Sequence, residues 1–537
     1  MPRRLSTAAN AFLALCLVLA GTAFTARTLV ALGSNGLLDW DETYYASTTS
    51  TAAHGLGLYP YVLGYPRIHD MGGVGYVVVL YVAAYKLIGA HLLALRLLSL
   101  VAGLAAAAGV WTLTRRLHGS AAGLAALALT PSLAVFQLSN TIRFDVFSIA
   151  YVAWALLLYL HASARPQSFR WHALVGLAFA LGLEVHLHTA AAAFAVGCAY
   201  LSQTIGSVRR NGIDRGWPAR RLAAFVAGYA VGAALFLMLN VLPDPHAYVR
   251  TAGLARLSAV ESGSALNLTA RMDTGRLAQS FISPVVIARK EVARYGGLFG
   301  AMRWWERLLW MVAIPTYLFV RRGPQRYPGR LLLAMAIVGG GIVFNSSSPL
   351  YTSAILPFFV PALATLVTHG FTTRAEVERA EISAASLVLT AVLAAAILPS
   401  PLSRTADAIR RLRSDSAPAP PAVVIAVRNA VAPECILAGP TDLYAMYFMA
   451  YPKFVGTREV EVLIGSTYYD LQQDPVAYWH EKRPDVIIGP VAGGLAVYLD
   501  QAAFTPIADT VWKRPDTLSP GCTIGNRTSI SNPGDCP

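Results

Sequence analysis

Charged side chains are scarce in this sequence. Asp, Glu, Lys and Arg together make up 13% of its 537 residues, about half of the roughly 25% that is typical of soluble domains. Hydrophobic residues reach 55%, and the mean hydropathy is +0.50. This composition excludes a soluble enzyme. The sequence also has no heptad, solenoid or collagen-like period, which argues against a repeat architecture.

Lysine and the acidic residues are rarer than arginine. The chain has 43 basic residues, only five of them lysines, against 29 acidic ones, so its formal net charge is +14. In nucleic-acid-binding proteins such an excess gathers on one basic face. Here the arginines stand in small groups between apolar stretches of about 20 residues, the length that crosses a bilayer. The charge therefore indicates membrane topology, and no nucleic-acid partner is expected.

Eleven apolar stretches are long enough to be membrane-spanning helices. They lie near residues 9–32, 91–113, 121–139, 146–163, 172–188, 189–205, 221–242, 304–321, 331–346, 351–370 and 382–400. By charge and position the first could also be a signal peptide, but its apolar run is too long and no clean cleavage site follows it. We expect it to remain as an anchor, in a polytopic α-helical membrane protein.

A twelfth apolar stretch, residues 72–90, is predicted not to cross the membrane. If the N-terminus is cytoplasmic and this stretch does not cross, the arginines of the short loops, such as Arg115 and Arg116, all lie inside, as the positive-inside rule requires. If it crossed, they would all move outside. We therefore predict an interfacial or re-entrant helix here.

Three segments are then expected outside the cytoplasm: 33–90, 243–303 and the tail 401–537. In the tail, strand-like runs at 423–427, 435–439, 460–465 and 485–489 alternate with helix-like runs at 442–449 and 474–482. This alternation predicts a small extracytoplasmic α/β domain, behind a transmembrane module of residues 1–400. The tail lacks a Gly-rich phosphate loop, so we expect it to stabilise and not to catalyse. Ala richness and few lysines hint at a bacterial inner-membrane protein.

Cysteine is rare, with five residues in the chain. Cys16 and Cys198 fall in predicted spans, where they are expected to be small buried apolar residues. Cys435, Cys522 and Cys536 lie outside, where oxidising conditions permit a disulfide. We predict a Cys522–Cys536 bridge, because both residues lie in the Gly/Asn/Pro-rich terminus. The spacing fits no zinc motif.

Three acidic residues follow the first span directly: Asp39, Asp41 and Glu42. Carboxylates placed so close together on the outer face, beside aromatic rings, can supply a general base or a divalent-metal site. They are also common at the start of a helix, where Asp caps the first turn. Metal dependence stays open.

A second acid, Asp145, lies at the outer end of the third span. Its neighbour Arg143 offers an interfacial ion pair as the simpler explanation. Arg67 and His69 lie on the same outer face, and guanidinium groups bind phosphate oxygens bidentately. The long loop adds further cations, for which solvation or nonspecific lipid attraction is the competing explanation.

Polar side chains at two further outer boundaries are candidates. His186 and His188 stand at the turn between the fifth and sixth spans, either as solvated residues or as phosphate or metal ligands. Glu184 lies deeper in the apolar run, where an ionisable group suggests function. Tyr351 opens a later span, either as an aromatic-belt residue or as a hydrogen-bond donor to a lipid phosphate.

The ordered set of these motifs resembles the membrane-embedded glycosyltransferases of the GT-C fold. The resemblance is closest to the family that contains the protein O-mannosyltransferases and the bacterial aminoarabinose transferases of lipid A, and it covers about residues 1–400. It rests on Asp41-Glu42, Tyr65-Pro-Arg-Ile-His69, Leu95-Arg96, Arg115-Arg116-Leu-His-Gly119, Arg143-Phe-Asp145, Gly182-Leu-Glu-Val-His-Leu-His-Thr189 and Tyr351…Pro357…Pro361. One departure is Asp70-Met-Gly-Gly73, where many relatives have a Pro-Pro pair.

The resemblance implies a polyprenyl-phosphate-linked sugar as donor and an acceptor hydroxyl on lipid, glycan or protein outside the cytoplasm. Asp41 would be the catalytic carboxylate, Glu42 its neighbour and Asp145 the second-loop acid; hexosyl and pentosyl transfer both stay open. The chemistry itself needs a base for the acceptor hydroxyl and positive groups for the departing phosphate. A transporter or lipid flippase is the alternative, but it typically needs inverted repeats, and none is visible.

Overall fold

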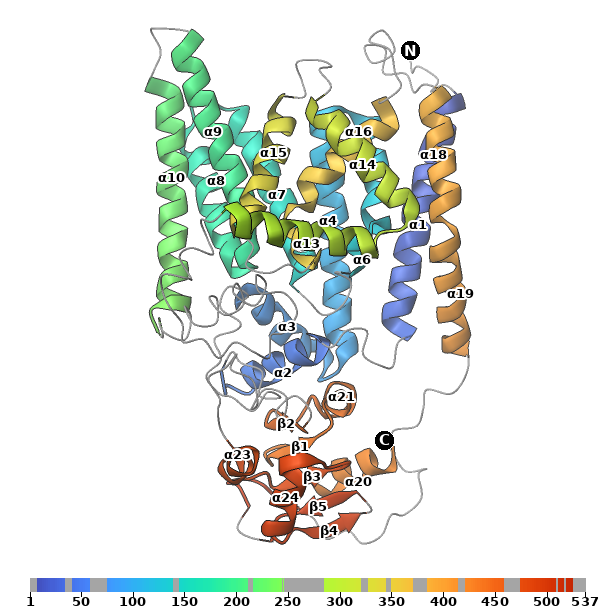
Figure 1. Cartoon of the computed structure of the whole chain (residues 1–537), viewed down its shortest axis with the longest axis vertical. Coiled ribbons are helices and arrows are strands. Elements are labelled where there is room, and N and C mark those ends of the chain that lie inside the picture. The colour runs from blue at the N-terminus through green and yellow to red at the C-terminus, as the bar shows by residue number, and fades with distance from the viewer. Residues whose placement is uncertain are drawn as a thin grey trace.

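The computed structural model describes residues 7–33, 41–57, 75–138, 144–210, 216–243, 245, 284–319, 327–343, 349–369, 384–413, 421–457, 474–508, 510–515 and 518–524. Most of them form one helical bundle, with the N-terminus at one end and a small sheet domain beyond the other (Figure 1).

The bundle is built from helices that agree with the predicted spans. They are α1 (Thr7–Gly33), α4 (Leu92–His118), α5 (Ser120–Leu129), α6 (Ala134–Leu138), α7 (Asp145–Ser163), α8 (Phe169–Leu181), α9 (Ala190–Arg210), α10 (Gly216–Phe236), α14 (Trp304–Phe319), α15 (Tyr327–Val343), α16 (Leu356–His369), α18 (Ala384–Ile397) and α19 (Pro399–Arg413). Five segments of the described chain are both long and apolar enough to cross a membrane, namely Ala11–Val30, Leu92–His118, Asp145–Ser163, Trp217–Val241 and Leu387–Arg410. The polytopic helical class is confirmed, whereas the count of eleven spans is not.

Two predicted spans are broken into shorter pieces. The stretch 121–139 becomes α5, the 3₁₀ turn η3 (Thr130–Ser132) and α6, because Pro131 has no N–H to continue the helical ladder. The stretch 172–188 becomes α8 followed by the 3₁₀ turns η4 (Gly182–Glu184) and η5 (Leu187–Thr189). Irregular backbone of this kind needs protein around it in a membrane, and η4 lies beside α3.

Three helices lie outside the set of long crossing helices. α2 (Asp41–Ala53) and α3 (Gly75–Ile88) lie between the bundle and the sheet domain, and α13 (Pro284–Ala301) runs across the bundle (Figure 1). With 14 residues, α3 is about 21 Å long, shorter than the bilayer core of about 30 Å. Because α16 and α18 also have 14 residues, this length is compatible with the predicted interfacial helix but does not test it.

The C-terminal domain is a five-stranded mixed sheet with helices, which confirms the predicted small α/β domain. Its elements are α20 (Ala422–Ala430), β1 (Leu437–Gly439), α21 (Thr441–Leu443), the π-helical η9 (Tyr444–Phe448), β2 (Phe454–Gly456), α23 (Pro475–Lys482), β3 (Val486–Ile488), α24 (Gly493–Gln501), β4 (Thr505–Ala508) and β5 (Val511–Lys513). The strand order is β2-β1-β3-β5-β4. β1 pairs in parallel with β2 and β3, whereas β5 pairs antiparallel with β3 and β4.

The predicted strand at 423–427 is wrong, because this run forms α20. Val424, Val427 and Val431 are buried at spacings of three and four, whereas Ile425 is 39% exposed. That spacing places the buried side chains on one helical face, and the same run as a strand would bury alternate residues instead. The predicted strand at 460–465 lies outside the described residues.

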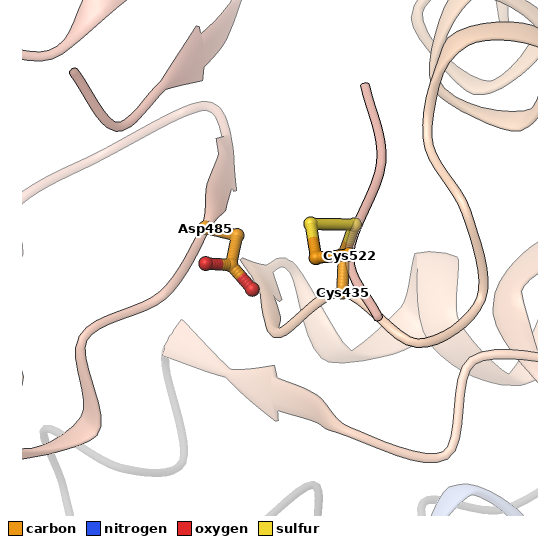
Figure 2. A group of neighbouring side chains, drawn as sticks. All are labelled: Cys435, Asp485 and Cys522. Carbon is orange, nitrogen blue, oxygen red and sulfur yellow. A yellow bond between two sulfur atoms is a disulfide. The ribbon is translucent and has the colours of Figure 1, made fainter. Parts of the chain in front are cut away.

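The predicted Cys522–Cys536 disulfide is also wrong, since Cys522 is bonded to Cys435 (Figure 2). The terminal segment returns to the start of the domain: Val431 and Ile524 form an antiparallel bridge, and Ala432 N donates to Thr523 O at 3.0 Å. This pairing places the two cysteines 87 residues apart in sequence but 4.5 Å apart at Cα. Cys536 lies outside the described residues.

The sheet domain shares its apolar core with the helices below the bundle. One cluster of buried side chains runs from Tyr81 of α3 to Tyr444 and Ile488 of the domain. Across this contact, Ser50 Oγ of α2 and Tyr85 Oη of α3 both donate to the carbonyl oxygen of Met449, at 2.7 and 3.1 Å. The domain is therefore packed against α2 and α3 and is not joined to the rest of the chain by the linker alone.

Candidate functional site

Aromatic contacts join the helix that begins with Asp41 to the loop that carries Asp145. Tyr45 of α2 meets Phe144 edge to face, with ring centroids 5.4 Å apart. Phe144 immediately precedes Asp145, the first residue of α7. The first turns of α2 and α7 thus lie side by side, at the end of the bundle that faces the sheet domain (Figure 1).

Glu42 is held in a buried, bidentate ion pair. Arg96 of α4 donates to it through Nε at 3.1 Å and through Nη2 at 2.6 Å, and the exposures of the two side chains are 2% for Arg96 and 0% for Glu42. Fork-to-fork geometry of this kind fixes direction as well as distance. Glu42 therefore fastens the first turn of α2 to α4.

Asp145 is buried at the N-terminus of α7, with 1% exposure. Ser353 Oγ, in the 3₁₀ segment η8 (Pro349–Ile355), donates to Asp145 Oδ1 at 3.2 Å. The helix dipole favours a negative charge at such a position. Asp145 thus joins α7 to η8, which leads into α16.

His186 and His188 pack as a pair against the same aromatic cluster. The His186 ring stacks on Phe144 at 4.0 Å, and the rings of His186 and His188 are also 4.0 Å apart. The backbone N–H of His188 donates to His186 Nδ1 at 3.0 Å. An imidazole that accepts at Nδ1 carries its proton on Nε2 when it is neutral, so His186 keeps a donor on its other side.

Glu184 joins three elements near this cluster. Its Oε1 accepts from Asn240 Nδ2, at the π-helical end η6 (Leu237–Val241) of α10. A Cβ added at Gly75, the first residue of α3, would lie 2.8 Å from Glu184 Oε2. The backbone of Gly75 is also hydrogen-bonded to the Glu184 carboxylate, so Glu184 contacts the start of α3.

Two cations from the long outer loop are neither solvated nor on the surface. Lys290 and Arg294 of α13 are 1% and 0% exposed. Lys290 Nζ donates to the carbonyl of Gly341 at 2.8 Å, and Arg294 pairs with Glu291. The Lys290 contact joins α13 to α15, whereas Arg294 and Glu291 form a pair within α13.

The structure brings four of the predicted site residues to this end of the bundle: Glu42, Asp145, His186 and His188. Asp41 is the first residue of α2, and Tyr351 lies in η8. For these two residues only the backbone positions are described. Four residues lie outside the described part of the chain: Asp39, Arg67, His69 and Arg143.

Sequence reasoning missed two partners in this cluster, Arg96 and Ser353. A charged residue in an apolar span is the signal that points to Arg96, whose place in the motif Leu95-Arg96 was noted without its role. No sequence signal distinguishes Ser353 from other small polar residues near a helix start.

Among the described residues, one compact group of side chains has the atom types that bind metal ions: Cys435, Asp485 and Cys522 (Figure 2). Its two sulfurs are joined in the disulfide, so neither is the thiolate that a metal ion needs. Asp485 accepts from Arg514 Nη2 at 2.8 Å, from Ser519 N at 2.9 Å and from Ile436 N at 2.8 Å. The disulfide and the hydrogen bonds of Asp485 therefore hold segments of the sheet domain together.

Comparison with known proteins gives a family match and a shared fold. Residues 77–211 match the family model described as dolichyl-phosphate-mannose-protein mannosyltransferase. No curated protein matches the chain by sequence.

Several solved structures resemble the chain. ArnT from Cupriavidus metallidurans in the apo state has a TM-score of 0.56 and 14% identity over 94% of this chain and 98% of that one. The same protein bound to undecaprenyl phosphate has a TM-score of 0.54 and 16% identity over 93% and 97%. The Archaeoglobus fulgidus oligosaccharyltransferase in the apo form has a TM-score of 0.50 and 13% identity over 89% and 69%.

The chain therefore has the fold of the GT-C class, which these solved structures share. Within that class, the resemblance to the protein O-mannosyltransferase and aminoarabinose transferase family is confirmed by the family match and by the ArnT-like architecture.

Proposed function

We propose that this protein transfers a sugar from a polyprenyl-phosphate-linked donor to an acceptor hydroxyl, on the side of the membrane that carries the sheet domain. The family match and the ArnT-like fold support this reaction class. The observation that carries the proposal is that α2, α7, η5 and η8 come together at the end of the bundle near the sheet domain. Tyr45 of α2 contacts Phe144, Ser353 of η8 bonds to Asp145 of α7, and His186 stacks on Phe144.

Asp41 is the proposed general base. Glu42 forms an ion pair with Arg96, and Asp145 accepts a hydrogen bond from Ser353. Both carboxylates are therefore suited to positioning α2 and α7. Asp41 begins α2 one residue before the fixed Glu42, and a carboxylate at a helix N-terminus is stabilised in its ionised form. An ionised carboxylate accepts the acceptor's proton as the hydroxyl attacks the anomeric carbon.

The departing phosphate gains negative charge as the glycosidic bond breaks. His186 and His188 are the proposed donors to it, since the His186 ring stacks on Phe144, next to Asp145 in the sequence, and the His188 ring packs against His186. Arg67, His69, Arg143 and Tyr351 remain proposed substrate contacts, on the strength of their motifs. Donors fixed in place before the reaction stabilise developing charge without reorganising.

The proposed topology puts the N-terminus in the cytoplasm and the sheet domain in the periplasm of a bacterial inner membrane. Arg115 and Arg116 lie in the last turn of α4, whose other end approaches α3 and the sheet domain (Figure 1). This arrangement keeps the arginines on the same side as the N-terminus, as the positive-inside rule favours.

The test is Asp41→Asn in the purified full chain, with a panel of polyprenyl-phosphate sugars and mass analysis of the lipid products. The change keeps size and removes the base, so turnover should fall by at least about 10²-fold, while donor binding is retained. Asp407→Asn, at an exposed acid of α19, is the matched control and should transfer normally. Near-normal transfer by a folded Asp41→Asn protein would reject Asp41 as the base.

A further inference from the structure

A pocket with a buried arginine lies between α1 and α19, away from the elements that form the candidate site. It holds about 410 Å³ including the space at its mouth, and its walls come from α1, η3, α6 and α19. Ala26, Val30 and Phe136 make its lining largely apolar, while Arg27, Ser400 and Arg404 supply the polar atoms. We call it the Arg27 pocket.

Arg27 is a cation inside the bundle without a described counter-ion. Its side chain is 6% exposed, and its guanidinium lies 4.9 Å from the centroid of the Phe136 ring. Nη2 donates to the carbonyl of Ser99 at 3.1 Å, whereas Nε and Nη1 have no hydrogen-bond partner among the described residues. A buried charge left in this way is costly unless an anion pairs with it.

The chain makes room for this guanidinium. A Cβ added at Gly103 of α4 would overlap Arg27 Nη1 and crowd its guanidinium carbon. A larger residue at 103 would force the guanidinium out, so the sequence accommodates the charge at this place.

Two more arginines gather at the same wall. Arg303, at the junction of α13 and α14, donates to Ser400 Oγ at 2.5 Å. It lies close enough to Arg404 for the two positive charges to interact, and Glu306 is the acid near it. Among the described residues at this wall, the guanidinium groups of Arg27, Arg303 and Arg404 outnumber the carboxylate of Glu306.

The surroundings favour a lipid as the source of the anion. Leu402, which stands between the lining residues Pro401 and Arg404 on α19, is 54% exposed, and Leu17 and Val18 of α1 are 51% and 53% exposed. Such side chains face acyl chains in a bilayer. The lining residues of α1 belong to its C-terminal half, and α1 runs from the N-terminal end of the bundle toward the sheet domain (Figure 1).

We propose that the Arg27 pocket binds the phosphodiester headgroup of an anionic phospholipid in the leaflet beside the sheet domain. The phosphate accepts hydrogen bonds from Arg27 and Arg404, and the apolar wall contacts the start of the acyl chains. The site is distinct from the proposed donor site, but Ser99 lies one turn after Arg96, so the two sites share α4.

The test is native mass spectrometry of the delipidated full chain in phosphate-free buffer, titrated with phosphatidylglycerol or phosphatidylcholine. We expect saturable binding of one phosphatidylglycerol, preferred roughly tenfold over phosphatidylcholine. Both lipids offer the same phosphodiester, but the choline of phosphatidylcholine adds a positive charge that the arginines of this region repel. Arg404→Gln and Arg27→Gln should each weaken phosphatidylglycerol binding by about tenfold. Arg410→Gln is the matched control, because Arg410 is an exposed arginine of the same helix.

Arg404 is exposed, so its substitution should not disturb folding even where Arg27→Gln does. Equal losses for Arg404→Gln and Arg410→Gln would overturn the proposal, as would equal binding of the two lipids. Displacement of phosphatidylglycerol by millimolar inorganic phosphate would assign the site to free phosphate instead and would also overturn it. None of these readouts depends on sugar transfer.

Discussion

Replacing Glu42 by methionine separates the structural role of this acid from a catalytic one. In the family resemblance, Glu42 stands beside the catalytic carboxylate. In the structure it is fully buried and takes two hydrogen bonds from Arg96, at 3.1 and 2.6 Å. Glu42→Met removes the carboxylate but leaves the arginine in a site that is only 2% exposed.

The expected cost follows from this burial. Removing one member of a buried pair costs about 3–5 kcal/mol, mostly because the remaining charge stays desolvated. The exposed pair of Arg410 and Asp407, whose side chains are 78% and 54% exposed, gives the internal comparison. Breaking it with Asp407→Asn should change stability by less than about 1 kcal/mol.

A double substitution tests whether the unpaired arginine causes the loss of stability. Glu42→Met with Arg96→Met removes both charges and keeps apolar volume, so stability should return to within about 1 kcal/mol of the parent. The measurements are the urea midpoint, followed by tryptophan fluorescence in micelles, and sugar transfer. We expect the single change to lower both and the double change to recover part of each. A Glu42→Met protein with parental stability and no transfer, matched by an equally inactive double variant, would refute the positioning role.

Three further outcomes are expected. Cys522→Ser should lower the stability of the sheet domain by about 2–5 kcal/mol, seen as an earlier unfolding transition, and peptide mapping should link Cys522 to Cys435 and not to Cys536. Ser353→Ala should lower turnover up to about tenfold by releasing Asp145, a loss that corresponds to one hydrogen bond to a charged group, and Ser353→Thr should restore much of it. Truncation after residue 413 should abolish transfer in membranes even where the bundle inserts, because it uncovers the shared apolar core; retained turnover would show that α2 holds its place alone.

Much of the fold follows from local signals in the sequence. Length and hydropathy place the helices of the bundle, and the prediction that α3 does not cross the membrane rests on the arginine distribution. Proline explains why α5 stops before Pro131. The error at 423–427 came from reading β-branched composition where the spacing of three and four was the stronger signal. Composition describes preference, whereas spacing describes which face is buried.

The site could be predicted only in part, because its bonds join distant segments. Glu42 and Arg96 are 54 residues apart, and Asp145 and Ser353 are 208 apart. A single sequence does not show which hydrogen-bond donor will contact which carboxylate across such distances. The same limit explains the disulfide error: proximity of Cys522 to Cys536 along the chain did not predict the return of the terminus to Cys435.

The sheet domain gains a role from the contacts that its sequence does not show. Its Met449 carbonyl receives Ser50 from α2 and Tyr85 from α3, and burial raises the pKa of the neighbouring Tyr444 phenol, which keeps it neutral in the shared core. At its other end α2 is held by the ion pair between Glu42 and Arg96. A short helix fixed at both ends keeps its backbone in one place, and a general base needs such a fixed position in order to act. We therefore expect the domain to support the proposed reaction without a catalytic residue of its own, by holding the helix that begins with the proposed base.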